Sequence, residues 1–452
     1  MKRILIANRG EIACRIIKAA RALGIETVAV YSEADENALF VERADQAVKI
    51  GPAPASESYL RVEALLEAAS QSGADAVHPG YGFLAENATF AQRVRTAGLT
   101  WIGPEPKSID DMGDKERARE IARAAGVPIL PGSERFSSCD PEAIQAAARM
   151  VGFPLLVKAC AGGGGIGMQR VDDPAKLLKA VESTQSAAKR GFGDDHVYFE
   201  RYVPRARHVE IQIFGLGDGR AFHLFERDCS VQRRFQKIIE ESPAPNLPAD
   251  MLERMAQSAR DLASVQNYSG AGTVEFLVDA ETTDFYFLEM NTRIQVEHAV
   301  TELICDVDLV GMQIRHAGGE DLEKELSAIK RSGAALECRL YAENPAKRFL
   351  PAPGTLETFR PPAGMDKVRI DTGVRQGDRI TPYYDPMIAK LIAWGEDRGT
   401  AVERAIAALD SFEIEGLATN REFLLAVLRE NDFRRGDVST GYIDAHPQIL
   451  MH

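Results

Sequence analysis

Short stretches that alternate between apolar and polar residues mark most of the expected strands in this chain, and stretches with a period near 3.6 mark its helices. The chain begins with an apolar strand over residues 3–7, a helical pattern over 11–23 and a second apolar strand over 26–31. This order predicts a right-handed unit with two parallel strands. Similar patterns follow, so residues 1–113 are expected to form an α/β domain with Rossmann-like topology.

A second region, residues 114–330, mixes helical and antiparallel patterns. A helix is predicted over 114–124, followed by a small unit over about 130–203 that contains a strand at 153–158 and another at 197–200. Longer strand patterns come after this unit and predict an antiparallel sheet.

Residues 331–452 combine short strands, Gly/Pro turns and a helix near 401–410. This mixture predicts a third domain of mixed α/β structure. The whole chain of 452 residues is therefore expected to be a multidomain α/β and α+β protein.

Two strand patterns, residues 273–278 and 285–290, are joined by a polar turn. A hairpin centred on this turn places Glu275 within one residue of Glu289, at a cross-strand distance of about 5 Å. Carboxylates this close repel unless a cation lies between them. With Asn291 one step along, the oxygen ligands suit Mg²⁺ or Mn²⁺. The alternative is that one carboxylate faces solvent.

The segment that follows this hairpin has polar residues at alternate positions: Glu289, Asn291, Arg293, Gln295 and Glu297. In an extended backbone, alternate residues share one face, so this segment is expected to be a strand with these side chains in a row. The opposite face would carry the apolar Met290, Ile294 and Val296. The mixed charges predict a site for cations and anions together, and a solvated strand is the alternative.

A glycine run, Gly162–Gly165 with Gly167 beyond, lies between a strand and a helix. Backbone N–H groups of such a loop can bind phosphate, and Lys158 on the preceding strand would support this. The run lacks the Gly-Lys-Ser/Thr of a Walker A loop, and a flexible linker is the alternative. Taken alone, Lys115 is as readily a surface lysine and His208 a structural histidine.

The composition is that of a soluble globular protein, with 45% hydrophobic and 27% charged residues. A net charge of −13 argues against non-specific binding to nucleic acid or anionic membrane. Six scattered cysteines without metal-type spacing predict buried thiols in a reducing compartment. The chain shows no signal peptide and no apolar run of membrane-spanning length, so a cytoplasmic protein is expected.

Several strings together resemble the ATP-grasp enzymes and, specifically, biotin carboxylase. They are spread over essentially the whole chain: Ala7-Asn-Arg-Gly-Glu-Ile-Ala13, His78-Pro-Gly-Tyr-Gly-Phe-Leu84, Met112-Gly-Asp-Lys115, Glu226-Arg-Asp-Cys-Ser-Val-Gln-Arg-Arg234, Glu289-Met-Asn-Thr-Arg-Ile-Gln-Val-Glu-His298, Glu337-Cys-Arg339 and Tyr383-Tyr-Asp-Pro-Met387. The string from Glu289 to His298 is the most specific of them. The resemblance implies an ATP-grasp central domain with a mobile glycine-rich lid over about 130–203.

The resemblance also implies roles for individual residues. The ATP-binding residues would be Lys115, Lys158, Gly163, Gly164, Gly165, Glu200, Arg201, Tyr202, Val203, His208, Gln232, Phe235 and Leu277. Two Mg²⁺ or Mn²⁺ ions would be bound by Glu275, Glu289 and Asn291. Bicarbonate would be bound by Lys237, Arg293, Gln295 and Val296. Glu297 would be the general base, Arg339 would stabilise the enolate of biotin, and Tyr81 would contact biotin with it.

Three residues depart from the family pattern. Ile166 stands where an arginine is usual, Phe235 where a histidine is usual, and Ala161 where a glycine is common. All three belong to the expected nucleotide site, so ATP binding or lid closure is expected to be weaker than in relatives.

The implied reaction is ATP-dependent carboxylation of biotin by bicarbonate, through carboxyphosphate, on a biotin carboxyl carrier protein. The chain would be one component of a multisubunit acyl-CoA carboxylase, with acetyl-CoA as the favoured substrate. It ends at His452 without a Met-Lys-Met biotinylation site, so carrier and carboxyltransferase are expected as separate polypeptides, and a homodimer is expected. The alternatives are another ATP-grasp ligase or a catalytically weak nucleotide-binding protein.

Overall fold

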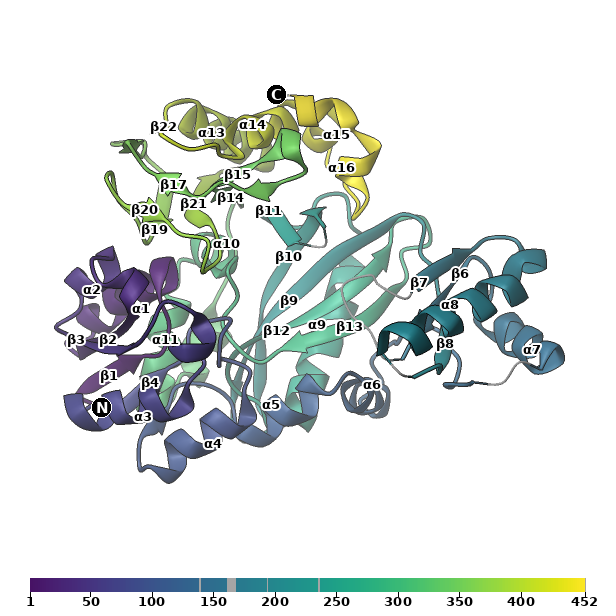
Figure 1. Ribbon diagram of the computed structural model, residues 1–452, viewed down its shortest axis with the longest axis horizontal. Coiled ribbons are helices and arrows are strands. Elements are labelled where there is room, and N and C mark those ends of the chain that lie inside the picture. Colours follow the sequence, from purple (N-terminus) through teal and green to yellow (C-terminus); the bar gives the residue numbers. More distant parts are fainter. Residues whose placement is uncertain (138–139, 161–167, 193, 235, 452) are drawn as a thin grey trace.

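The structure, a computed structural model, describes residues 1–137, 140–160, 168–192, 194–234 and 236–451. Gly163, Gly164, Gly165, Ile166 and Phe235 lie outside these ranges, as does Ala161, so the predictions made for them stay predictions. The described residues form an N-terminal parallel-sheet domain, a central ATP-grasp domain and a C-terminal domain, arranged around one central sheet (Figure 1).

The N-terminal domain has a five-stranded sheet in the order β3-β2-β1-β4-β5. Its strands are β1 (Arg3–Ile6), β2 (Glu26–Ser32), β3 (Gln46–Gly51), β4 (Ala76–His78) and β5 (Thr100–Trp101), all parallel. Its helices are α1 (Gly10–Ala22), α2 (Leu39–Arg43), α3 (Val62–Ser72), α4 (Ala88–Thr96) and α5 (Pro106–Gly113). The predicted strand–helix–strand unit is confirmed. The strand order changes direction between β1 and β4, where open α/β sheets bind ligands.

A small unit, at the far right in Figure 1, contains the segment predicted to carry the lid. Its three strands pair antiparallel in the order β7-β6-β8. The elements are α6 (Lys115–Ala124), which leads into the unit, then α7 (Pro141–Val151), β6 (Leu155–Ala159), β7 (Met168–Val171), α8 (Leu177–Phe192) and β8 (Val197–Arg201). Leu155, Val157 and Phe199 form part of its own apolar core.

An eight-stranded sheet in the order β13-β12-β9-β10-β11-β14-β21-β19 runs through the middle of the molecule. Its strands are β9 (Ala206–Leu216), β10 (Ala221–Arg233), β11 (Gln236–Ser242), β12 (Ser269–Asp279), β13 (Phe285–Asn291), β14 (Ala334–Tyr341), β19 (Val368–Thr372) and β21 (Met387–Gly395). The helices of this region are α9 (Ala249–Val265), α10 (His298–Cys305), α11 (Leu309–Ala317) and α12 (Glu323–Ala328). The sheet therefore continues from the ATP-grasp domain into the C-terminal domain.

The predicted hairpin is confirmed, because β12 and β13 pair antiparallel with Glu275 directly opposite Glu289. The prediction that the strand continues to Glu297 is wrong. Strand β13 ends at Asn291, and after a loop the helix α10 begins at His298.

Apart from backbone hydrogen bonds with the start of α10, the loop 292–297 takes its backbone contacts from side chains and not from a neighbouring strand. The pairing of β12 with β13 ends at Asn291, so the loop has no strand partner on that side. The Thr292 N–H donates to Glu86, and the Val296 carbonyl accepts a hydrogen bond from Lys390. Alternation of polar residues alone could not show this, because it reports which side chains are buried and not what binds the backbone.

The C-terminal domain surrounds the far end of the sheet with short strands and helices. Its remaining strands are β15 (Glu343–Asn344), β16 (Leu350–Pro351), β17 (Gly354–Thr355), β18 (Thr358–Arg360), β20 (Arg379–Ile380) and β22 (Glu413–Glu415). Its helices are α13 (Arg398–Asp410), α14 (Arg421–Arg429), α15 (Asn431–Arg434) and α16 (Tyr442–Ala445). No helix in the described part of the chain is long and apolar enough to cross a membrane.

Candidate active site

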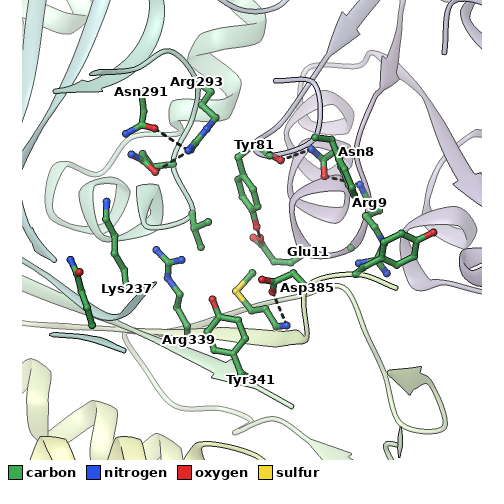
Figure 2. A pocket seen from close by; sticks show the side chains of 18 of the residues that line it. Asn8, Arg9, Glu11, Tyr81, Lys237, Asn291, Arg293, Arg339, Tyr341 and Asp385 are labelled. Carbon is green, nitrogen blue, oxygen red and sulfur yellow. Dashed lines mark hydrogen bonds between the residues drawn. The ribbon is translucent and has the colours of Figure 1, made fainter. Parts of the chain in front are cut away.

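A cavity of about 830 Å³ lies where the three domains meet. The N-terminal domain contributes the segments that follow β1 and β4, the ATP-grasp domain contributes β9 to β13 and the loop 292–297, and the C-terminal domain contributes β14 and residues 383–387. Figure 2 shows Lys237, Arg339 and Tyr341 on one side of this cavity, with Tyr81 and Glu11 across from them. The cavity therefore gathers residues that are far apart in sequence.

Glu275, one of the predicted metal ligands, is 3% exposed and surrounded by donors. Asn291 and Gln295 donate amide hydrogen bonds to it at 2.9 and 3.0 Å. Lys237 Nζ lies 2.8 Å from one carboxylate oxygen, and His208 Nε2 lies 2.6 Å from the other. Burial alone would raise the pKa of Glu275, but the Lys237 and His208 charges outweigh it and hold the pKa well below its usual range.

Glu289 differs from Glu275, although the two are direct cross-strand partners. Its side chain lines the cavity, and it has no hydrogen bond or ion pair with another described residue. Burial and the charge of Glu275 raise its pKa. A divalent cation between the two carboxylates would relieve this repulsion, so the residues present fit Mg²⁺ or Mn²⁺.

Lys237 lies at the centre of three carboxylates and connects the predicted metal site to the predicted base. Its Nζ is 2.6 Å from Glu210, 2.8 Å from Glu275 and 2.7 Å from Glu297. Burial alone would lower its pKa, but these carboxylates raise it well above the usual value. The ammonium therefore stays charged, which an anion-binding lysine requires.

Glu297 and Arg339, predicted as base and enolate-stabilising residue, contact each other directly. Arg339 Nη2 lies 2.9 Å from Glu297 and 2.6 Å from Glu240. Burial would raise the pKa of Glu297, but Lys237 and Arg339 lower it well below its ordinary value. Glu297 is therefore ionised and able to accept a proton.

Arg293 is positioned from three sides. Its Nε lies 2.9 Å from Glu86, and its guanidinium donates to Asn291 and Gln295 at 3.0 and 3.1 Å. Val296 lines the same cavity two residues before helix α10. All four predicted bicarbonate residues therefore border one cavity, although they do not lie on one strand.

Tyr81, predicted to contact biotin, lies across the cavity from Arg339 (Figure 2). Its hydroxyl donates to Glu11 at 2.5 Å. Burial and the Glu11 charge raise the pKa of this hydroxyl well above its usual value, so it remains a neutral donor.

The predicted ATP residues fall into two groups. His208 and Gln232 line the cavity, and Gln232 Nε2 is 2.8 Å from His208 Nδ1. His208 thus contacts both Gln232 and Glu275, so its neighbours are residues of the predicted site.

The second group lies outside this cavity, in and near the small unit. Lys158 pairs with Glu200 on the neighbouring strand, and Lys115 is exposed at the start of α6. Arg201 is exposed, and Tyr202 lies under the guanidinium of Arg170, whose carbon is 4.1 Å from the ring centre. Val203 and Leu277 belong to a small apolar cluster with Leu130 and Ala206.

Sequence reasoning missed several buried charged residues of the site. These are Glu11, Glu210, Arg227, Glu240 and Lys390, and the exposed Glu86, which pairs with Arg293, was missed as well. Glu210 could have been found, because it lies two residues after His208 on the same strand and shares its face. Glu240 follows the run of cations that ends at Lys237 and is flanked by apolar residues, which indicates that part of this run points inward, whereas Lys390 lies in an otherwise apolar strand that gives no sign of its contacts.

Family models match the chain in three segments. "Biotin carboxylase, N-terminal domain" covers residues 1–109, "Carbamoyl-phosphate synthase L chain, ATP binding domain" covers 114–325, and "Biotin carboxylase C-terminal domain" covers 337–445. Together with the three-domain fold, these matches define the protein as an ATP-dependent ligase of the ATP-grasp class.

Curated relatives match over nearly the whole chain. The alpha component of mitochondrial methylcrotonoyl-CoA carboxylase from Oryza sativa is 48% identical over 100% of this chain and 61% of the relative. A pyruvate carboxylase component from Methanothermobacter thermautotrophicus is 48% identical, covering 98% of this chain and 90% of the relative. Biotin carboxylase 1 of Bacillus subtilis is 46% identical, covering 99% of each. The chain thus spans only 61% of the methylcrotonoyl-CoA carboxylase relative.

Solved structures agree with these matches. The biotin carboxylase domain dimer of Hydrogenobacter thermophilus 2-oxoglutarate carboxylase, in complex with MgADP, ADP and bicarbonate, has a TM-score of 0.90 at 43% identity, covering 99% of this chain and 98% of that one. The Campylobacter jejuni biotin carboxylase complex with β-γ-ATP has a TM-score of 0.90 at 43% identity, covering 98% and 99%. The chain belongs to the biotin carboxylase family, and its reaction is the ATP-dependent carboxylation of biotin.

Proposed function

We propose that this chain carboxylates biotin on a biotin carboxyl carrier protein, as the biotin carboxylase component of a multisubunit acyl-CoA carboxylase. The observation that supports this most directly is the cavity itself, where an anion-binding lysine, an ionised glutamate and an arginine adjoin a pair of carboxylates. This arrangement combines a cation site, an anion site and a proton acceptor within a few ångströms.

Glu275 and Glu289, with Asn291 assisting, would hold two Mg²⁺ or Mn²⁺ ions. When bound, such ions neutralise charge on the phosphates of ATP and orient them for transfer. Glu289 has no hydrogen bond or ion pair with another described residue, whereas Glu275 is held in place by Lys237, His208 and neighbouring amides. The nucleotide is proposed to bind to Lys115, Lys158, Glu200, Arg201, Tyr202, Val203, Leu277, His208, Gln232, Phe235 and the glycines 163–165.

Bicarbonate would bind at Lys237, Arg293, Gln295 and Val296. The Arg293 fork can donate two parallel hydrogen bonds to a planar carboxylate-like anion. An oxygen of bicarbonate attacks the γ-phosphorus of ATP, so the bond to ADP breaks and carboxyphosphate forms. Glu297 accepts the bicarbonate proton in this step, since its neighbours keep it ionised.

Arg339 and Tyr81 would then bind biotin. The N1′ nitrogen of biotin is a very weak acid, so removal of its proton needs a cation at the developing enolate oxygen. Carboxyphosphate would break down to CO₂ and phosphate; the phosphate would accept the N1′ proton, and N1′ would then form the bond to the carbon of CO₂. Arg339 lies beside Glu297 and opposite Tyr81, which suits this role (Figure 2).

The holoenzyme substrate is proposed to be acetyl-CoA, with a carrier protein, a carboxyltransferase and a second copy of the chain as partners. The relatives are named as methylcrotonoyl-CoA, pyruvate and 2-oxoglutarate carboxylases, so each of these three compounds is an alternative carboxyl acceptor. Domain limits at 113/114 and 330/331 are likewise proposed, and the family models leave short gaps at both.

The test is ADP release by the purified chain with ATP, MgCl₂ and bicarbonate, with and without free biotin. We expect activity that needs bicarbonate and rises with biotin, and transfer of labelled bicarbonate to a biotinylated carrier domain. ADP release that does not change when biotin is added would favour another ATP-grasp ligase. ATP binding without turnover would favour a nucleotide-binding role alone, the alternative motivated by Ile166 and Phe235.

A further inference from the structure

Lys390 is a charged residue buried in an otherwise apolar strand. It lies on β21, in the stretch Met387-Ile-Ala-Lys-Leu-Ile-Ala-Trp394, and is 0% exposed. It stands directly opposite Arg339 on the neighbouring strand β14. A hydrophobic residue would pack into this position at lower cost, since an ammonium must be fully paired to be buried.

The contacts of Lys390 reach two other domains. Its Nζ donates to the Val296 carbonyl at 2.7 Å and pairs with Glu11 at 3.0 Å. Asp371 lies farther away, at 3.8 Å. Burial alone would lower the pKa of Lys390, but Glu11, Glu337 and Asp371 raise it, so the ammonium is charged.

The Val296 carbonyl belongs to the peptide group that also contains the Glu297 N–H. A peptide group is planar and rigid, so a hydrogen bond to one end orients the other. Among the described residues the loop 292–297 has no strand partner beyond Asn291, and Lys390 is the side chain that binds the Val296 carbonyl. The same ammonium pairs with Glu11, which accepts the Tyr81 hydroxyl on the opposite side of the cavity.

We infer that Lys390 is a positioning residue for the reaction: it holds the Val296–Glu297 peptide and so places the Glu297 carboxylate between Lys237 and Arg339. This inference rests on the proposed function, because it assigns Glu297 as the base. Through Glu11, Lys390 also links the placement of the base to the placement of Tyr81. The alternative is a purely structural role, in which Lys390 only neutralises the buried carboxylate of Glu11.

A double-mutant cycle of Lys390→Met, Glu11→Gln and the double variant separates the two, and Glu11→Gln alone measures how much the loss of the Glu11 carboxylate beside Tyr81 lowers kcat. Lys390→Met removes both the hydrogen bond and the charge, and leaves Glu11 buried without its cation. Lys390→Met with Glu11→Gln removes the uncompensated charge but does not restore the bond to Val296. We expect the double variant to regain the urea unfolding midpoint lost in Lys390→Met, while kcat stays about 100-fold below that of the unaltered chain, the cost of a misplaced group.

The kinetic signature is a fall in kcat without a matching rise in the KM for ATP, because the nucleotide residues are untouched. Lys390→Arg should recover part of kcat, since a guanidinium can donate to both Val296 and Glu11. Arg398→Met is the matched control. Arg398 also binds a carboxylate, Glu241, and two backbone carbonyls, but it lies away from the cavity, so stability should fall and kcat should not.

Recovery of kcat together with stability in the double variant would overturn the inference, as would near-normal kcat in Lys390→Met. If Lys390→Met fails to fold, the double variant and Lys390→Arg decide the question. The unaltered chain is measured first. If it lacks biotin- and bicarbonate-dependent ADP release, the proposed function fails; if it has that activity and the variants do not follow the expected pattern, only the role of Lys390 fails.

Discussion

Glu275 and Glu289 are opposite each other on two strands, yet their surroundings differ. Glu275 accepts from four side chains, whereas Glu289 has no such partner among the described residues. We expect Glu289→Gln to abolish metal-dependent turnover while the unfolding midpoint without metal stays equal or rises, because one repelling charge is removed. The measurement is MgCl₂-dependent ADP release together with thermal unfolding in EDTA.

Glu275→Gln should also abolish turnover, but its effect on stability should be the opposite. Neutralising Glu275 leaves Lys237 and His208 with less compensating charge, and breaking a buried pair costs about 3–5 kcal/mol. The unfolding midpoint of this variant should therefore fall in EDTA. Full activity in either variant would contradict the metal assignment.

Arg339→Ala should block carboxylation of biotin while it spares much of the bicarbonate-dependent ATPase measured without biotin. The guanidinium is needed when enolate charge develops, and losing such a contact costs on the order of 3 kcal/mol. Both rates can be measured on one preparation, with Arg339→Lys as the variant that keeps the charge but loses the fork. An equal loss of both activities would show that Arg339 serves the phosphate-transfer step or the fold.

Glu240 predicts a pH dependence of stability. It is fully buried with Arg339 and Lys237 as nearby cations and Glu297 and Glu337 as nearby acids, and burial raises its pKa from 4.5 to about 7. A carboxyl group with a raised pKa favours the folded state at low pH and loses that contribution as pH rises from about 4.5 to about 7. The ionised form of Glu240 therefore stabilises the folded state less than the neutral form does.

The unfolding free energy of Glu240→Gln relative to the unaltered chain measures this contribution. The free energy of unfolding of the variant should rise relative to that of the unaltered chain as pH rises from about 5 to about 8, since the amide cannot ionise. A difference that does not change with pH would mean that Glu240 keeps an ordinary pKa, and a change in the opposite direction would mean that its pKa is lowered in the folded state.

At the scale of elements, the β12–β13 hairpin was predictable because its register follows from the turn, and the turn is visible in the sequence. The loop 292–297 was not, because its conformation depends on Glu86 and Lys390, which come from other domains. The residues of the candidate site were nevertheless found, since the resemblance identifies them from sequence strings and does not depend on the secondary structure of the segment. Among the charged residues behind them, Glu210 shares a strand face with His208 and could have been found, whereas Lys390 carries no local signal.

The contact between β19 and α1 gives a prediction at this scale. Gly373 follows β19, and a Cβ atom there would lie 2.3 Å from the Gly10 carbonyl carbon and 2.4 Å from the Glu11 nitrogen. Gly373→Ala should therefore displace the first turn of α1 and lower both the melting temperature and kcat. Gly441→Ala is the control, because no heavy atom of a described residue, its two chain neighbours aside, lies within 4 Å of its Cβ position. Unchanged values for Gly373→Ala would show that the two elements separate easily.

For the whole molecule, the three-domain architecture was predictable from the resemblance and from the change in pattern along the chain. The way the domains join was not, because the sheet order gives no local sequence signal. Two strands of the C-terminal domain, β14 and β21, extend the sheet that begins in the ATP-grasp domain. Ion pairs such as Lys390–Glu11 and Arg15–Glu302 then connect both domains to the N-terminal one.

The continuous sheet also has a consequence for synthesis of the chain on the ribosome. Strand β11 emerges well before its partner β14, with α9, the β12–β13 hairpin and three further helices made in between. During that interval its edge is open to pairing with other nascent chains. Lys237, Glu240 and Glu241 interrupt this strand with charge, so the residues that later serve the cavity and its surroundings also discourage aggregation while the sheet is incomplete.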